Sequence, residues 1–211
     1  MHQHTKDITY RGLPLAEAKK AMIMIHGRGA TPESVLGLAT YLELDDFALL
    51  APRATQGTWY PYSFMAPVSQ NEPSLSSALS VLDGVVTEIR AADIADEHIY
   101  FLGFSQGACL ASEYVAQKGQ KYGGLFVYSG GLIGAELDTS KYKGDFSGMP
   151  VLLGCSDTDA HIPLARVKET AAYFQEVGAE VTERIYPNGA HTVFEDEIEQ
   201  TNAILAKART Q

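Results

Sequence analysis

A serine with a glycine two positions before it and another two positions after it follows one of the short apolar segments of the sequence. Residues 99–102 are apolar and predict a strand, residues 103–107 read G-F-S-Q-G, and a helical pattern then runs to residue 118. A serine on such a sharp strand-to-helix turn exposes its hydroxyl, and the glycines avoid collisions between the strand and the helix. The helix points its first amides at charge that develops on a reacting carbonyl. These features predict that Ser105 is a nucleophile.

A histidine base is needed because a serine hydroxyl is a weak nucleophile until a neighbouring group accepts its proton. In serine hydrolases with this turn, the base follows the serine in the chain. Four of the six histidines precede Ser105, and the first two belong to a polar terminus that we expect to fray: His2, His4, His26 and His98. His161 and His191 remain, and His191 stands directly after a predicted strand, 181–186, and before the last predicted helix. We predict His191 as the base, the alternative being a histidine that caps that helix.

Two aspartates that could orient the base follow the predicted strand 151–153. The chain order in these hydrolases is serine, acid, histidine, so the acid is expected in this loop. Asp159 lies deeper in the loop, just ahead of Ile162 and Pro163, where the next helix begins. Asp157 is closer to the end of the strand, where a short polar side chain commonly closes a turn through its own backbone. The sequence favours Asp159 as the acid and leaves Asp157 as the alternative.

Short apolar runs alternate with helical patterns along the whole chain. Strands are predicted at 21–25, 47–51, 99–102, 124–128, 151–153 and 181–186. Helices are predicted at 32–42, with Thr31 as N-cap, at 75–89, from the serine motif to 118, at 164–174 and at 193–208. This alternation is typical of an α/β fold with a mostly parallel sheet and helices on both faces. Ligands bind at the carboxyl ends of such strands, where the candidate residues stand.

Composition limits the classes of protein to which the chain can belong. The length of 211 residues predicts a single domain over residues 1–211. The net charge of −10 argues against nucleic acid or an anionic membrane as a partner, and no apolar run approaches the ~18 residues of a membrane span. We expect a cytoplasmic protein, because the polar N-terminus lacks a secretion signal and two cysteines are too few for a disulfide framework. Cys109 and Cys155 are expected to be inert core residues.

Taken together, the motifs resemble those of the phospholipase/carboxylesterase family, which includes bacterial carboxylesterases and acyl-protein thioesterases. The matching pieces are I-H-G at 25–27, G-F-S-Q-G at 103–107, D-x-D-x-x-I-P at 157–163 and Y-P-x-G-x-H at 186–191. The resemblance covers nearly the whole chain and implies an α/β-hydrolase fold without a cap domain. It also implies a catalytic triad of Ser105, Asp159 and His191, and an oxyanion hole formed by the backbone amides of Arg28 and Gln106.

Two side chains depart from the pattern of the thioesterases in this family. After the H-G pair at 26–27 the thioesterases usually have an apolar residue and then Gly-Asp, whereas this chain has Arg28, Gly29 and Ala30. A cationic side chain at this place favours a smaller or more polar substrate than a long lipid acyl chain. His161 also stands where the thioesterases lead us to expect an apolar residue. The chain is therefore more similar to the smaller bacterial hydrolases of the family.

Four aromatic residues cluster in one long loop of the sequence. The loop, 52–73, is rich in proline and lacks helical periodicity. We predict that Trp59, Tyr60 and Phe64 line the substrate site, because aromatic rings form rigid apolar walls. His161 is predicted to join them. The alternative is that the loop packs on the core or forms the face of a homodimer.

The predicted reaction is hydrolysis of a carboxylic ester through an acyl-enzyme intermediate. A thioesterase or a lysophospholipase is the alternative activity; a peptidase or amidase, and a ligand-binding module on a hydrolase scaffold, rank lower. The expected partner is a small-molecule ester. No group of residues has the spacing of a metal site and no loop has that of a nucleotide site, so we expect neither a metal nor a cofactor.

Overall fold

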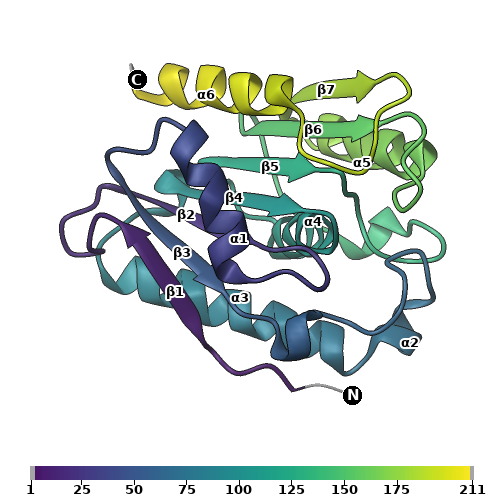
Figure 1. Ribbon diagram of the computed structural model, residues 1–211, viewed down its shortest axis with the longest axis horizontal. Helices are drawn as coiled ribbons and strands as arrows, with labels where there is room; N and C mark the ends of the chain where they lie inside the picture. The colour runs from purple at the N-terminus through teal and green to yellow at the C-terminus, as the bar shows by residue number, and fades with distance from the viewer. Residues whose placement is uncertain (1–2, 210–211) are drawn as a thin grey trace.

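The computed structural model describes residues 3–209, which form a seven-stranded sheet in the order β1-β3-β2-β4-β5-β6-β7 (Figure 1). β1 runs antiparallel to β3, and all the other neighbours are parallel. The strands are β1 (Ile8–Gly12), β2 (Lys20–Ile25), β3 (Phe47–Pro52), β4 (Ile99–Phe104), β5 (Gly124–Tyr128), β6 (Pro150–Ser156) and β7 (Glu180–Tyr186). The mostly parallel sheet predicted from the alternation of strands and helices is confirmed.

Helices cover both faces of the sheet, as predicted. Within the described residues they are α1 (Pro32–Leu36), α2 (Val68–Asn71), α3 (Ser74–Ala91), α4 (Gln106–Lys118), α5 (Leu164–Glu176) and α6 (Glu195–Arg209), with 3₁₀ turns η1 (Gly37–Tyr41), η2 (Thr55–Gly57), η3 (Asp96–His98) and η4 (Thr139–Lys141). Apolar side chains of α3, α4 and α5 pack on one face, and those of α1 and α6 pack on the other, which is turned to the viewer in Figure 1. None of these helices is long and apolar enough to span a membrane.

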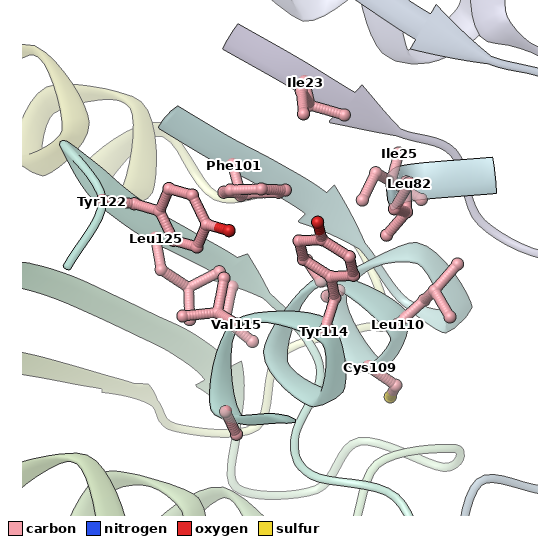
Figure 2. Packing of buried hydrophobic residues seen from close by; sticks show 14 of the residues in the cluster. Ile23, Ile25, Leu82, Phe101, Cys109, Leu110, Tyr114, Val115, Tyr122 and Leu125 are labelled. Carbon is pink, nitrogen blue, oxygen red and sulfur yellow. The ribbon is translucent and has the colours of Figure 1, made fainter. Parts of the chain in front are cut away.

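The pairing of the central strands aligns one side chain from each strand in a row across the sheet. Ile23 of β2 pairs with Phe101 of β4, and Phe101 pairs with Leu125 of β5. This row faces α3 and α4, and Figure 2 shows Phe101 between Tyr114 of α4 and Tyr122. Burial of each such side chain stabilises the fold by roughly 1.5–3 kcal/mol. The packed centre therefore holds the strand ends in a fixed register.

The structure departs from the prediction at one edge of the sheet, in the first helix and in the predicted loop 52–73, which contains η2 and the short helix α2. β1 is not predicted, because this edge strand is only partly buried and Tyr10 in its middle is 49% exposed. The predicted helix 32–42 begins as expected, with the Thr31 hydroxyl accepting from the Ser34 N–H. It then tightens into η1 at Gly37, because glycine is a poor helix former.

The N-terminal segment is held against the long loop, so the expectation that it frays is wrong for His4. The His4 Nε2–H donates to the Trp59 carbonyl oxygen at 2.8 Å, and His4 Nδ1 accepts from the Thr55 N–H at 3.1 Å. These contacts arise from tertiary packing, which a polar terminal sequence does not indicate. His2, the other histidine of this segment, lies outside the described residues.

Candidate active site

The chain reverses sharply at Ser105, between the end of β4 and the start of α4. Ser105 has φ 56° and ψ −121°, a conformation that residues with a side chain rarely adopt. A methyl group added to Gly103 would lie 2.5 Å from the Gly107 carbonyl carbon, and one added to Gly107 would lie 2.1 Å from the Ile25 carbonyl oxygen. The close approach of three backbone segments therefore requires both glycines of the motif and holds the strained serine in place.

Three of the predicted residues, from three different loops, form one hydrogen-bonded chain at the carboxyl ends of the strands. The Ser105 hydroxyl donates to His191 Nε2 with an Oγ–Nε2 distance of 2.8 Å. His191 Nδ1–H donates to Asp159 Oδ2 at 2.6 Å. Because an ionised carboxylate only accepts, this contact selects the tautomer whose Nε2 can accept the serine proton. The Asp159 side chain is fully buried, and that of His191 is 19% exposed.

The Asp159 carboxylate also accepts hydrogen bonds from the chain that turns around it. Its Oδ1 accepts from the backbone N–H groups of His161 and Ile162, at 2.8 and 3.0 Å. Burial by itself would raise the pKa of Asp159, but the hydrogen bonds from His191 and from these two amides outweigh burial and lower the pKa below its usual value. The carboxylate is therefore ionised at neutral pH and can stabilise a positive charge on the imidazole.

Asp157, the alternative acid, does not reach the histidine. Its Oδ1 accepts from the Asn188 N–H at 2.7 Å, and the neighbouring Ser156 hydroxyl donates to the Gly189 carbonyl oxygen at 2.8 Å. Both contacts tie the end of β6 to the loop that carries His191 after β7. The side chain of Asp157 thus joins two loops, and the expectation that it closes a turn on its own backbone is wrong.

The two backbone amides expected at the oxyanion hole lie beside the serine turn. Gln106 follows Ser105 as the first residue of α4, so its N–H has no acceptor within the helix. A methyl group added to Gly27 would lie 3.4 Å from Ser105 Cβ, which places the segment leading into Arg28 against the same turn. No group among residues 3–209 accepts a hydrogen bond from the Arg28 N–H. Both N–H groups are thus available to an oxygen bound next to Ser105.

His26 supports this segment from the interior. Its Nδ1–H donates to the Gly27 carbonyl oxygen at 2.8 Å, and its Nε2 accepts from the Ala54 N–H at 3.1 Å. Burial lowers the pKa of His26, so the imidazole is neutral and can both donate and accept. His26 therefore connects the end of β2 to the start of the long loop.

The side chain of Gln106 holds the aromatic loop, a role that the sequence does not predict. We call residues 58–64 the aromatic wall. The Gln106 Oε1 accepts from the Trp59 N–H at 2.9 Å, and the Nε2–H donates to the Tyr60 carbonyl oxygen at 2.8 Å. Gln106 is only 5% exposed. A buried amide that bonds two adjacent residues fixes the aromatic wall relative to the serine turn.

The Arg28 guanidinium holds the same aromatic wall from the solvent side. Its Nη1 donates to the Thr58 hydroxyl at 2.8 Å and to the Pro61 carbonyl oxygen at 3.0 Å. Its Nη2 donates to the Tyr62 carbonyl oxygen at 2.7 Å. The sequence does not predict this clamp, because no local pattern pairs the side chains of Arg28 and Gln106 with a loop far along the chain.

A cavity of about 570 Å³ opens over Ser105 and His191. Three of the four side chains predicted to bind substrate line it: Tyr60, Phe64 and His161. The wall is completed by residues that include Arg28, Cys109 and Ile162. Sites for small organic ligands commonly have about 300–1,000 Å³, so the cavity has the size for a small ester.

Trp59, the fourth of these predicted residues, does not line the cavity. Its side chain is completely buried, and its Nε1–H donates to the His26 carbonyl oxygen at 2.9 Å. The indole therefore packs in the core, on the side of the loop away from the cavity. Its large apolar surface is buried there and its N–H has a hydrogen-bond acceptor. The prediction for Trp59 is wrong, and for this residue the alternative of core packing is the observed one.

Two rings flank the His191 imidazole. The His161 ring stands at 66° to it with the centroids 4.9 Å apart, and the Phe104 ring lies on it with a centroid distance of 4.9 Å. Both contacts limit rotation of the imidazole about its side-chain bonds, so the hydrogen bonds to Ser105 and Asp159 are maintained by packing as well as by charge.

The two cysteines are free thiols and buried. Cys109 reaches the cavity wall, although the sequence indicates core packing alone. Burial raises the pKa of Cys109 and of Cys155 to about 12, so both thiols stay protonated and do not compete as nucleophiles. Within residues 3–209, no three histidine, cysteine, aspartate or glutamate side chains cluster in a way that could hold a metal ion.

Comparison with known proteins shows the family and the fold of the chain. The family model of the phospholipases and carboxylesterases matches residues 13–208. The chain belongs to the phospholipase/carboxylesterase family. The fold of this family member is an α/β-hydrolase fold: a crystal structure of a phospholipase/carboxylesterase from Dyadobacter fermentans has 48% identical residues and a TM-score of 0.95, and the match covers 97% of this chain and 99% of that one. Within the described residues no cap domain covers the sheet.

Curated relatives of this family member are more distant. Acyl-protein thioesterase 1 of Kluyveromyces lactis is 26% identical, over 90% of this chain and 92% of that protein. A probable SOBER1-like carboxylesterase of Arabidopsis thaliana is 25% identical over 67% of this chain. That match spans 54% of the Arabidopsis protein, so the chain corresponds to about half of its length.

Proposed function

We propose that this protein hydrolyses carboxylic esters through an acyl-enzyme formed on Ser105. The observation that carries the proposal is the pair of hydrogen bonds from Ser105 to His191 and from His191 to the buried Asp159, beneath the cavity. A nucleophile, a base and an orienting acid are the groups that acyl transfer requires. Membership of a family of phospholipases and carboxylesterases supports the same class of reaction.

In the first step, the Ser105 oxygen attacks the ester carbonyl carbon while its proton passes to His191 Nε2. The new carbon–oxygen bond moves an electron pair onto the carbonyl oxygen. The N–H groups of Arg28 and Gln106 donate to this oxyanion, and each such donor lowers the activation free energy by about 3–4 kcal/mol. The ionised Asp159 stabilises the imidazolium that forms.

In the following steps, the imidazolium gives its proton to the alcohol oxygen, and the bond from this oxygen to the carbonyl carbon breaks. Water then gives a proton to His191 Nε2 and attacks the acyl-Ser105 carbonyl. Collapse of this second intermediate returns the proton to Ser105 and releases the acid. One ester and one water thus become one carboxylic acid and one alcohol, and the enzyme is regenerated.

Thioester hydrolysis is the second candidate, because acyl-protein thioesterase 1 of Kluyveromyces lactis aligns with 90% of this chain. The same steps apply to a thioester. The cavity volume of about 570 Å³ and the cationic Arg28 favour a short or polar acyl group over a long lipid chain, which also ranks a lysophospholipase lower. The single domain, the cytoplasmic location and the homodimer stay predictions.

Labelling by a fluorophosphonate probe tests the nucleophile, with turnover of a p-nitrophenyl ester as a second measurement. Ser105→Ala is expected to abolish labelling and to lower kcat by at least about 10³-fold. Ser112→Ala is the matched control, because Ser112 lies on the same helix and its hydroxyl donates to the Ala108 carbonyl oxygen. This control should label as the wild type does. Labelling that survives in Ser105→Ala would contradict the proposal.

A further inference from the structure

The cavity differs in charge from the molecule as a whole. The chain has 26 acidic and 16 basic side chains and a net charge of −10. Among the described residues that line the cavity there is no aspartate or glutamate, whereas Arg28, His161 and His191 are present. The ionised Asp159 lies behind His191 and does not line the cavity, so an anion in the cavity would meet the Arg28 cation with no acidic side chain among the described lining residues.

The positive charge is concentrated on Arg28, and no carboxylate neutralises it. The three hydrogen bonds of its guanidinium go to uncharged oxygens, those of the Thr58 hydroxyl and the Pro61 and Tyr62 carbonyls. No acidic side chain in the described part of the chain forms an ion pair with Arg28. Other arginines of this chain do have carboxylate partners: Arg53, Arg90, Arg166 and Arg184.

The guanidinium keeps donors for a ligand and is already oriented. A guanidinium has five N–H donors. The three hydrogen bonds to the aromatic wall come from Nη1 and Nη2, and the Nε–H donates to no group among residues 3–209. The Nε–H is thus open to a carboxylate, and a carboxylate that accepts from the Nε side of a guanidinium can form a bidentate pair with the neighbouring Nη. Because the aromatic wall already fixes the side chain, binding costs little of its conformational entropy.

We propose that the substrates are small esters that carry a carboxylate, which pairs with the Arg28 guanidinium while the ester carbonyl lies over Ser105. The inference rests on the proposed ester hydrolysis. The backbone N–H of the same residue is the expected oxyanion donor, so the carboxylate is held within the length of one arginine side chain from the scissile bond. The carboxylate belongs to either the acyl or the alcohol half of the ester and takes no part in the bond changes.

The alternative is that Arg28 only clamps the aromatic wall. A clamp acts on the shape of the cavity, so its loss would impair charged and neutral substrates alike. A charge partner binds the charged ester specifically, so its loss would lower kcat/KM for the charged ester more than for the neutral one. The anionic preference, defined as the ratio of kcat/KM for a charged ester to that for a matched neutral ester, separates the two roles.

Two matched pairs of esters measure this preference. Mono-p-nitrophenyl adipate against p-nitrophenyl hexanoate places the charge in the acyl half. 3-Acetoxybenzoate against its methyl ester places it in the alcohol half. Each kcat/KM is divided by the rate constant for hydroxide-catalysed hydrolysis of the same ester, so that intrinsic reactivity cancels.

Three variants distinguish charge from shape. Arg28→Gln is expected to lower the anionic preference about three- to fivefold in at least one pair, the effect of a partly exposed charge pair. Arg28→Lys keeps the charge and should retain most of the preference. Arg90→Gln is the control, because Arg90 pairs with Asp96 outside the cavity and its removal should leave the preference unchanged.

The salt dependence of the wild type gives a test that needs no variant. The anionic preference should fall as the ionic strength rises from about 0.02 to about 0.5 M, because salt screens an exposed charge pair. A preference that salt does not alter overturns the proposal, as does an equal loss on charged and neutral esters in Arg28→Gln. Failure of the proposed function is recognised separately, since then neither ester of a pair is hydrolysed in a way that depends on Ser105.

Discussion

The two sides of the cavity are held in place by different chemistry. The aromatic wall is fixed by uncharged amides and one guanidinium, those of Gln106, Asn71 and Arg28. The opposite side, which we call the histidine wall, consists of residues 156–159 and 186–194. It is fixed by carboxylates: Asp157 accepts from the Asn188 N–H, Asp159 from His191, and Glu197 from the Phe194 N–H at 2.7 Å. Among the described residues, carboxyl groups hold only the second wall, whereas the titratable side chain that contacts the first is the imidazole of His4, at the Trp59 carbonyl oxygen.

Titration of carboxyl groups should therefore act on the histidine wall and spare the aromatic wall. Amides and guanidinium groups keep their charge state between about pH 4 and pH 10, whereas a carboxyl group with a shifted pKa can titrate in that range. Burial raises the pKa of Glu197 to about 8. Its Oε1 has no hydrogen-bond partner among residues 3–209, and a methyl group on Gly154 would lie 2.0 Å from that oxygen. The Glu197 carboxyl that supports the histidine wall is thus tightly packed, and its neutral form is more favourable to bury than its ionised form.

The largest expected effect comes from separating the two aspartates of the histidine wall. Asp159→Asn should lower kcat by about 10³–10⁴-fold, because an amide no longer selects the productive imidazole tautomer. Asp157→Asn is the matched control and should cost less than about tenfold, since it weakens one hydrogen bond to the Asn188 N–H. Turnover of one p-nitrophenyl ester, with melting temperatures as a check on folding, decides between them. A larger loss of kcat in Asp157→Asn than in Asp159→Asn would show that Asp157 is the acid.

Glu197→Gln tests the pH sensitivity of the histidine wall. The pKa of Glu197 is about 8 in the folded protein against 4.5 ordinarily, so between these values the folded state binds more protons than the unfolded chain. The contribution of Glu197 to stability is full below about pH 4.5 and is lost as the pH rises through about 8, by about 2–4 kcal/mol.

The variant should lack this loss because its side chain does not titrate. Thermal melting of both proteins at about pH 5 and about pH 8 measures it, and the wild type should lose about 5–10 °C more than Glu197→Gln over this interval. An equal loss of melting temperature in the two proteins between these pH values would show that the buried carboxyl does not control the pH response.

Gln106→Ala makes the corresponding test on the aromatic wall. The substitution leaves the Trp59 N–H buried without its acceptor and should lower the free energy of unfolding by about 2 kcal/mol. Because the lost group does not titrate, the decrease should be the same at pH 5 and pH 8. Urea unfolding at both pH values measures it, and a loss that depends on pH would remove the distinction between the walls.

The smallest effect is expected from Trp59→Phe, which distinguishes core packing from substrate binding within the aromatic wall. Loss of the hydrogen bond to the His26 carbonyl oxygen should cost about 1 kcal/mol of stability and change kcat/KM by less than about twofold. Phe64→Leu, at a residue that lines the cavity, should change KM more than Trp59→Phe does. If Trp59→Phe changes KM more than Phe64→Leu does, Trp59 belongs to the substrate site.

Chain order and the predicted strands were sufficient to locate the loops that carry the candidate triad. Ser105 and Asp159 each follow a strand with an apolar run, and His191 follows β7, which reads E-V-T-E-R-I-Y; parallel strands present their carboxyl ends at one edge of the sheet. The structure places the three side chains in hydrogen-bond contact, and their catalytic roles stay predictions. Asp157 and Asp159 follow the same strand so closely that only the surrounding motif could separate them.

Side-chain directions in the long loop could not be predicted in the same way. Trp59 and Tyr60 are adjacent and aromatic, yet one enters the core and the other lines the cavity. An irregular loop has no period from which an inner and an outer face can be read. The clamps of Gln106 and Arg28 are contacts between distant parts of the chain, and these leave no local pattern in the sequence. The sequence does not predict β1 for a related reason: this strand forms by pairing with β3, which is distant in the chain.

Gly107 sets a limit on how this candidate active site can change in evolution. A methyl group at its Cα would lie 2.1 Å from the Ile25 carbonyl oxygen and 2.6 Å from that of His26. The serine turn and the segment that leads to Arg28 are therefore locked together, and no side chain at position 107 can adjust their spacing. The aromatic wall is held by side chains that mutation can exchange one at a time. New substrate preferences should accordingly arise through the aromatic wall and its clamps, while descendants inherit the spacing around the nucleophile unchanged.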